Sequence, residues 1–348
     1  AKKQEIELNK INITHINVGV ELNTISYISK YLDKNNNIPL ELKIRNTEVD
    51  SGNKGDYLTD EFKPSINFPV IFSSLRPSLV SYVGNPGKFY FGNINLDYKS
   101  EVHFNRNLLL SSEISYTLSD SFSKLPYNPD SVLQHVRTDL TKYLQEDDLH
   151  INRMQFDYIW SPYKNIYSKL TGGILEPMFA GVGGQTVYKP FDKNYSIGYE
   201  LFYVKQRTYK KRFNLQDYET ITGHINLGYK FAAGIEASLS YGRYLAKDYG
   251  FTLDLARTTK SGFKSGIYFT RTNISADTFG EGSFDKGFYF QIPLDLLSNE
   301  FNGSYTSFKL SPLTRDGGAK LIHDKELSGL IYNSTIHDLI RQWDGYLN

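Results

Sequence analysis

The sequence predicts an all-β fold, namely an antiparallel transmembrane β-barrel, or part of a larger one, with a small N-terminal α/β segment. Apolar and polar side chains alternate from about Ile94 to Leu310 in about a dozen successive segments, as strands with one apolar and one polar face do. The 27 tyrosines and 22 phenylalanines recur on the apolar side, as aromatic girdles at membrane interfaces would. Mean hydropathy is −0.43, and no stretch approaches the roughly 20 apolar residues of a spanning helix.

The alternation is clearest between residues 220 and 244, and it predicts which face each side chain occupies. One face is expected to meet lipid: Ile221, Ile225, Leu227, Tyr229, Ile235, Leu239 and Tyr241. The opposite face is expected to meet a watery lumen: Thr222, His224, Asn226, Glu236 and Ser240.

Composition excludes several other classes. The 39 basic and 38 acidic residues nearly balance, and no basic run suggests nucleic acid as a partner. The chain has no cysteine, so it forms neither disulfides nor a thiolate metal site. Its seven histidines lack the i, i+4 spacing of a helical zinc site. Gly280-Glu281-Gly282 is not followed by the lysine and serine of a phosphate-binding loop. We therefore predict no metal and no cofactor.

Residues 1–65 differ from the rest and predict a small α/β module, either periplasmic or plugging the lumen. Glu5–Val20 is expected to form a strand and Asn23–Leu32 an amphipathic helix that ends at three successive asparagines. A second strand is expected over Pro39–Glu48, where apolar residues alternate with charged ones. The alternative is a long excursion between strands.

Residues 66–333 are expected to supply the barrel strands. The candidate strands are centred on Ser78–Tyr82, Tyr90–Val102, Leu108–Leu118, Ile151–Trp160, Ile166–Ile174, Gly181–Tyr188, Tyr195–Val204, Thr220–Tyr229, Ile235–Tyr244, Tyr249–Arg257, Phe263–Asn273, Gly287–Leu294 and Gly303–Leu310. Ser161-Pro162 is one of several short turn-like junctions, whereas Ser119–His150 and Gln206–Tyr218 are long loops. Short turns at one end and long loops at the other are typical of outer-membrane barrels.

Two further helices are predicted from apolar residues at helical spacing. Ser131–Leu144 is expected to be helical and to fold into the lumen as a constriction. Residues 334–348 are expected to form a C-terminal helical tail, with Ser334 as its N-cap. The final Gly-Tyr-Leu-Asn differs from the terminal aromatic strand of many bacterial barrels, so closure is expected to need strands outside these 348 residues.

Five motifs in a fixed order resemble the YjbH-like family, also called GfcD-like, of outer-membrane exopolysaccharide and capsule proteins. The motifs lie within residues 136–144, 175–184, 241–250, 279–287 and 311–318. The resemblance runs from about Pro77 to Leu321 and is weaker on either side. Family members look longer upstream, and Ala1 is followed at once by charged residues, so we interpret the chain as the C-terminal portion of a larger protein.

The resemblance implies a barrel in the outer membrane of a Gram-negative bacterium that assists secretion of an exopolysaccharide or capsule polymer. Its implied partners are the polysaccharide, the lipid bilayer and other exopolysaccharide export proteins. The family supplies no known catalytic residue, so we predict that the chain is not an enzyme.

Charged residues near the motif turns are candidates for the lumen and the polymer path. A charge facing mid-bilayer lipid costs about 2–4 kcal/mol, which favours the lumen or a rim, where charges and tyrosines could contact sugars. A salt-bridge network that braces the wall is the alternative, and both roles can coexist. The candidates are Arg137, Asp139, Glu176, Arg243, Asp248, Glu281, Asp285, Lys286, Arg315 and Asp316. Six of them (Arg137, Glu176, Arg243, Asp285, Arg315 and Asp316) are expected to converge inside one barrel.

Two other functions stay open at this point. An outer-membrane enzyme that trims or modifies the polymer could pair Glu176 with Asp285 or Glu281, although 38 acidic residues make such pairs easy to find. A hydrolase would need serine and histidine together, and His224 shares a face with Ser238 and Ser240, but no aspartate-oriented triad can be identified. A soluble periplasmic β-sandwich that binds carbohydrate is the third possibility, and it requires a second sheet over the apolar face.

Overall fold

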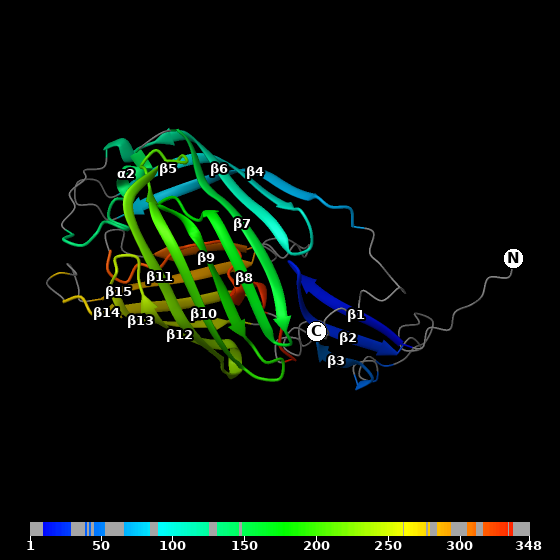
Figure 1. Cartoon of the computed structure of the whole chain (residues 1–348). Helices are drawn as coiled ribbons and strands as arrows, with labels where there is room; N and C mark the ends of the chain where they lie inside the picture. Colours follow the sequence, from blue (N-terminus) through cyan, green and yellow to red (C-terminus); the bar gives the residue numbers. More distant parts are fainter. Residues whose placement is uncertain are drawn as a thin grey trace.

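The computed structural model shows a large curved sheet with a smaller sheet at one end (Figure 1). Its described residues are 10–28, 39, 42, 45–52, 66–83, 90–124, 131–145, 148–259, 261–275, 278, 284–293, 305–310, 316–332 and 334–336.

The large sheet has 13 antiparallel strands, and each strand pairs with its sequence neighbours. The strands are β4 (Val70–Val83), β5 (Tyr90–His103), β6 (Leu108–Asp120), β7 (Leu149–Tyr163), β8 (Ile166–Ile174), β9 (Phe179–Tyr188), β10 (Tyr195–Arg207), β11 (Leu215–Lys230), β12 (Ile235–Arg243), β13 (Tyr249–Thr258), β14 (Lys264–Thr272), β15 (Asp285–Pro293) and β16 (Tyr305–Leu310). Short helices are η3 (Phe122–Lys124), α2 (Leu140–Gln145), η4 (Ala232–Gly234) and α4 (Leu327–Leu330).

All 13 strands expected between residues 78 and 310 are present, so the antiparallel all-β prediction is confirmed. One junction was misplaced. Ser161-Pro162 lies inside β7, which continues to Tyr163, and the pairing with β8 shifts register there. The Ser161 hydroxyl donates to the carbonyl groups of Tyr163 and Ile166 at 3.0 and 2.8 Å, which holds this irregularity within the strand.

The two faces of the sheet follow the predicted alternation. The seven side chains from Ile221 to Tyr241 that were assigned to lipid are all 39–60% exposed. On the opposite face Thr222, His224 and Ser240 are buried, and Asn226 and Glu236 are half-buried. No second sheet covers the exposed face within the described part of the chain, which contradicts the β-sandwich interpretation.

The edges of the sheet differ from its middle. Among the described residues, β4 and β16 each have a single strand neighbour, so the two edges are not joined to each other. β4 exposes side chains on both faces, with Phe72 61% exposed on the inner face and Leu75 64% exposed on the outer face. Residues 306–310 of β16 are likewise exposed on both faces, so the inner face is enclosed less at the two edges than in the middle of the sheet.

The N-terminal module is a three-stranded antiparallel sheet of β1 (Lys10–Asn17), β2 (Val20–Ile28) and β3 (Glu48–Ser51). The predicted helix over Asn23–Leu32 is wrong for residues 23–28, which belong to β2, and the predicted strand Pro39–Glu48 is wrong at 45–47. Val18 and Gly19 both have positive φ, and this turn joins β1 to β2 as a hairpin. The periodicity suited a helix, but pairing with β1 decided for a strand.

Residues 316–332 cross the inner face of the large sheet. We call residues 316–332 the strap and the space enclosed by the inner face the lumen. Inner side chains of strands from β5 to β12 contact the strap, so the sheet curves around it. Among the described residues, no helix is long and apolar enough to cross a membrane. Of the predicted tail helix, only Ser334, Thr335 and Ile336 are described.

The predicted helix over Ser131–Leu144 is only partly formed, because α2 begins at Leu140. The main-chain N–H groups of residues 136–138 donate to the Asp316 carboxylate of the strap instead of to helical carbonyl groups. The segment nevertheless packs inside the sheet, since Val136 and Tyr143 are fully buried against the inward-facing Phe202 and Val204.

Candidate functional site: the lumen and its strap

Asp316 fixes one end of the strap. Its Oδ1 accepts the main-chain N–H groups of Val136, Arg137 and Thr138 at 2.9, 2.7 and 3.0 Å, and its Oδ2 accepts the Thr138 hydroxyl at 2.8 Å. Asp316 is 2% exposed, so these four hydrogen bonds satisfy a buried carboxylate. One side chain therefore determines where the strap begins relative to the loop before α2.

An ion pair lies beside this anchor. Arg137 donates from both terminal nitrogens to the two carboxylate oxygens of Glu176, at 2.9 and 3.1 Å, and also to the Lys320 carbonyl group at 2.6 Å. Glu176, in the turn between β8 and β9, is 2% exposed. Burial raises the pKa of its carboxyl, while Arg137 opposes that rise. The pair thus joins a loop, a turn and the strap.

Two more loop carboxylates complete this polar anchor. Asp248, between β12 and β13, accepts the Gly318 N–H at 2.8 Å, and burial raises the pKa of Asp248 above its ordinary value. Asp139 contacts His135 at 2.9 Å and accepts the Tyr209 hydroxyl at 2.7 Å. The backbone of the Asp248 turn also contacts the strap, because the Leu245 N–H donates to the Ala319 carbonyl at 3.0 Å.

The middle of the strap crosses a row of buried polar side chains. His323 stacks on Phe202 with ring centroids 4.8 Å apart, and its Nδ1 lies 3.1 Å from Lys169 Nζ. Lys169, fully buried, also donates to the Asp324 carbonyl at 2.7 Å and lies 3.5 Å from the buried Asp157. Lys325 forms an ion pair with Glu101 of β5. These contacts connect the strap to β5, β7, β8 and β10.

The opposite end of the strap is held by apolar packing. Leu327 and Ile331 pack in one cluster with Leu109, Ile159 and Tyr167 of the sheet and with Val20 and Leu22 of the N-terminal hairpin. Asn17 also donates to the Leu330 carbonyl at 2.9 Å. The hairpin turn lies close against the β5–β6 turn, where a Cβ on Gly19 would lie 2.7 Å from the Arg106 carbonyl oxygen. The N-terminal sheet therefore packs against this end of the lumen and its strap.

Tyr332, the last residue of the strap, makes polar contacts with the sheet beside the apolar cluster. Its hydroxyl donates to Glu236, and its ring lies 3.7 Å from Lys230 Nζ and 5.3 Å from Lys264 Nζ. Lys189 donates to the carbonyl groups of Ile331 and Tyr332 at 2.7 and 3.0 Å. The C-terminal end of the strap therefore contacts three lysines, namely Lys189, Lys230 and Lys264.

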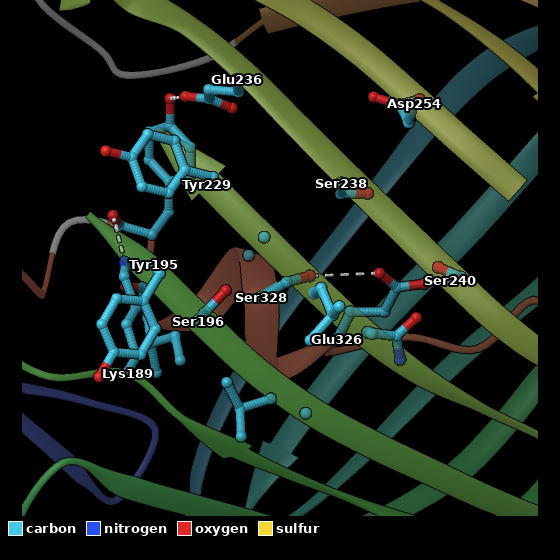
Figure 2. A pocket seen from close by; sticks show the side chains of 18 of the residues that line it. Lys189, Tyr195, Ser196, Tyr229, Glu236, Ser238, Ser240, Asp254, Glu326 and Ser328 are labelled. Carbon is cyan, nitrogen blue, oxygen red and sulfur yellow. Dashed lines mark hydrogen bonds between the residues drawn. The ribbon is translucent and has the colours of Figure 1, made fainter. Parts of the chain in front are cut away.

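A cavity of about 380 Å³ lies between the strap and strands β9 to β13 (Figure 2). Its sheet side is lined by Ser196, Asn226, Ser238, Ser240 and Asp254, and its strap side by Lys320, Glu326 and Ser328. A second polar cavity lies on the other side of the strap, against β4 to β7, where Glu101, Glu113, Arg153 and Asp324 line it. The strap therefore divides the lumen into two polar compartments.

The ten predicted site residues are only partly brought together. Arg137, Asp139, Glu176, Asp248 and Asp316 gather at the polar end of the strap, where Asp316 belongs to the strap, Arg137 and Asp248 bond to it, Glu176 pairs with Arg137, and Asp139 contacts His135 and Tyr209 beside it. Glu281 and Arg315 lie outside the described residues. Asp285 is half-buried at the start of β15, on the inner face.

Two of the predicted residues do not join the others. Arg243 continues the outward row of Leu239 and Tyr241, and its guanidinium lies 5.7 Å from the ring of the exposed Tyr249. Lys286 is exposed and shares the outward face with Phe288, and its Nζ lies 4.9 Å from the Phe284 ring. Both residues sit at strand ends; Lys286 is exposed to water there, whereas Arg243 is half-buried and its Nε is buried. The expected convergence of six residues therefore does not include Arg243.

The lining of the cavity against β9 to β13 was not predicted as a site. Asn226, Ser238 and Ser240 had been placed on the polar face, but no role was assigned to them. The available signal was the alternation itself, since small polar residues recur on the inner face of three consecutive strands. The strap residues Lys320 and Glu326 gave no such signal, because only the folded chain places them opposite these strands.

Comparison with known proteins identifies relatives of this chain. The profile of the YjbH family, described as "Exopolysaccharide biosynthesis protein YbjH", matches residues 3–333. The "Uncharacterized lipoprotein YjbH" of Escherichia coli (strain K12) is 36% identical over 255 residues, which are 71% of this chain and 36% of that protein. The chain thus spans about a third of that relative's length. The match also includes residues before Pro77, where the motif resemblance was weak.

Two solved structures of OmpT, an outer membrane protein of Vibrio cholerae, are also similar. The in-vitro folded form has a TM-score of 0.31 at 9% identity, over 73% of this chain and 92% of OmpT. A loop L8 deletion mutant has a TM-score of 0.30 at 9% identity, over 65% of this chain and 87% of the mutant.

Proposed function

This chain belongs to the YjbH family of exopolysaccharide biosynthesis proteins, and we propose that it assists secretion of an exopolysaccharide or capsule polymer across the bacterial outer membrane. In this proposal the apolar outer face lies in the bilayer, and the polymer passes along the polar lumen. Other exopolysaccharide export proteins deliver the polymer, and no bond is made or broken by this chain.

The observation that carries the proposal is the contrast between the two faces of one sheet. Tyr199, Ile225 and Tyr241 are each about 60% exposed on the outer face, where lipid would cover them. The inner face carries hydroxyl, amide, carboxylate and ammonium groups from β5 to β14. Such groups exchange hydrogen bonds with sugar hydroxyls, and weak contacts at many points allow a polymer to move on.

The strap lies in this path, because it crosses the lumen between the two compartments. In our proposal it shifts when polymer passes. The 348 residues of this chain contain no cysteine, and the Leu245 N–H donates to the Ala319 carbonyl at 3.0 Å, so a disulfide introduced at this pair gives a direct test. We expect that the pair Leu245→Cys and Ala319→Cys, once oxidised, lowers secreted polymer per cell and that a reductant restores secretion. The two single cysteine variants are the controls.

Normal secretion with a fully cross-linked strap would contradict a path that needs strap movement. Barrel abundance is measured in parallel, so that poor folding is not mistaken for a blocked path.

The alternative function, an outer-membrane enzyme that modifies the polymer, predicts a large loss of activity when a single catalytic carboxylate is replaced. Loss of a catalytic acid or base typically costs a factor of about 100 or more in rate. We expect only modest loss of secretion for Glu176→Gln and Asp285→Asn at matched protein levels. Abolished secretion from either variant, with the folded protein at normal abundance, would favour the enzyme.

A further inference from the structure

We infer that the cavity between the strap and strands β10 to β13 is a binding site for a neutral, hydroxyl-rich glycan segment. This inference rests on the proposed function and deepens it, because it names one place where the polymer is held and the kind of sugar held there.

The floor of the cavity consists of two rows of small residues that cross four strands. Strand pairing places one row in register as Ser196, Gly228, Ser238 and Asp254, and the next row as Gly198, Asn226, Ser240 and Thr252. Neighbouring strands lie about 4.8 Å apart, so the polar groups of a row are spaced by about 5 to 10 Å. Glycines between them leave a hollow floor with hydrogen-bonding groups around it.

The polar groups of the floor are available to a ligand. Within the described part of the chain, the side chains of Ser196, Asn226, Ser238 and Ser240 make no hydrogen bond to protein. Ser238 is exposed even though it lies on the inner face, because the cavity lies over it. Hydroxyl and amide groups can both donate and accept, which suits sugar hydroxyls.

The strap forms the roof of the cavity and presents a different face to it. Lys320, Glu326 and Ser328 line the cavity, whereas Leu327 and Ile331 are buried in the apolar cluster. Figure 2 shows Glu326 and Ser328, joined by a hydrogen bond, among the lining side chains that also include Ser238 and Ser240. The roof therefore offers an ammonium donor and a carboxylate acceptor opposite the hydroxyl floor.

The charges of the lining select against an acidic sugar. The lining carboxylates are Glu200, Glu236, Asp254 and Glu326, and Lys320 is the one lining lysine whose side chain makes no hydrogen bond or ion pair within the described part of the chain. Lys189 and Lys230 already donate to strap carbonyl groups, and Lys264 pairs with Glu236 at 3.1 Å. The formal charges of the four lining carboxylates and the four lining lysines cancel, so the lining has no net positive charge to offset the desolvation of a uronate carboxylate, whereas a neutral sugar does not incur that cost.

The size of the cavity agrees with this ligand. Its volume of about 380 Å³ lies near the lower end of the range of about 300–1,000 Å³ for small-molecule sites. A short segment of one or two sugar rings is therefore the unit that we expect to be held.

The test is equilibrium binding to the purified chain in dodecyldimethylamine oxide, a detergent without a sugar headgroup. The probes are neutral trisaccharides of glucose, galactose and mannose, with trigalacturonate as the acidic probe. We expect at least one neutral probe to bind and trigalacturonate to bind at least about tenfold more weakly, a difference that one unfavourable buried charge contact can produce.

Matched variants locate the site. Ser238→Leu together with Ser240→Leu fills the floor and should reduce neutral binding by about tenfold or more. Ser111→Leu makes the same change on the inner face of β6, in the compartment across the strap, and should leave binding unchanged. Asp254→Asn should narrow the difference between neutral and acidic probes, because it removes one carboxylate.

The inference is overturned if no neutral probe binds, if trigalacturonate binds more tightly, or if the filled floor binds as well as the unchanged chain. Secretion separates this failure from failure of the proposed function. Should cells still need this protein to secrete polymer while the purified chain binds no neutral sugar, the export proposal stands and the glycan site does not.

Discussion

The two ends of the strap are held differently: a buried carboxylate fixes one end, whereas an apolar cluster, followed by the polar contacts of Tyr332, holds the other. At the polar end Asp316 alone accepts four hydrogen bonds, and Arg137 and Glu176 form a buried ion pair beside it. At the apolar end Leu327 and Ile331 fill a cluster shared by the sheet and the N-terminal hairpin. Hydrogen bonds have fixed directions, so the polar end sets the position of the strap, whereas burial of apolar area at the other end is tolerant of small shifts.

This difference predicts which changes the molecule tolerates. Removing one partner from a buried polar anchor leaves the remaining groups unsatisfied, and the cost exceeds the net value of the bonds themselves. Trimming an apolar side chain costs the lost transfer free energy and a cavity, in proportion to the volume removed. The polar end is therefore expected to be the more sensitive to single substitutions.

The largest effect is expected for Asp316→Ala. It removes the acceptor of three main-chain N–H groups and one hydroxyl, and each buried unsatisfied group costs about 1–3 kcal/mol. The free energy of unfolding of the detergent-folded protein, from urea titration, should fall by roughly 4 kcal/mol or more. Asp316→Asn keeps an oxygen at the Oδ1 position and should lose much less. Equal losses for the two variants would show that the hydrogen bonds do not position the strap.

Arg137→Met should follow, because it leaves the Glu176 carboxylate buried without its partner. Breaking a buried ion pair from one side costs about 3–5 kcal/mol. Adding Glu176→Gln to Arg137→Met should recover part of that loss, since the uncompensated charge is gone. The four-member set of urea titrations measures this coupling, and strictly additive losses would contradict it.

Ile331→Ala tests the apolar end and should cost about 2–4 kcal/mol. Ile331→Val, which removes a single methylene, should cost about 1 kcal/mol and serves as the graded control. Hydrogen exchange should then rise in the hairpin around Val20 as well as in the strap, because they share one cluster. A rise confined to the strap would mean that the N-terminal sheet does not depend on it.

The smallest effect is a pH dependence at His135, next to the polar end. Its Nδ1 faces Asp139 and its Nε2 faces the Ser131 carbonyl, so both nitrogens must donate, which requires the protonated ring. Burial lowers the pKa of His135, but the contacts with Ser131 and Asp139 outweigh it and the pKa is raised. A raised pKa adds stability below the ordinary value of about 6.5, and that stability is lost as pH rises through the raised pKa.

The measurement for His135 is the difference in unfolding free energy between the unchanged protein and His135→Gln at several pH values. The difference should be largest near pH 5.5 and should shrink toward pH 8.5, with other titrations cancelling. A constant difference would mean that the pKa of His135 is the same in the folded and the unfolded protein.

The sequence by itself determined the strands, because a period of two is local and records which side of a sheet each residue faces. The same alternation also predicts the face of two candidate site residues that had been assigned to the lumen. Arg243 stands two residues after the outward-facing Tyr241, and Lys286 two residues before the outward-facing Phe288, so alternation already excluded both from the lumen.

Only the tertiary structure decided the remaining features, since each depends on residues far apart in the chain. The segment from Asn23 to Ile28 suits a helix or a strand by its own pattern, and pairing with β1 made it β2. The main-chain N–H groups of residues 136–138 donate to the Asp316 carboxylate, 178 to 180 positions away, instead of to helical carbonyl groups. The sequence of the strap has no periodicity from which its position in the lumen could be predicted. It lies in the lumen because the inner side chains of many strands, each fixed locally, together supply the partners that its backbone and charged groups need.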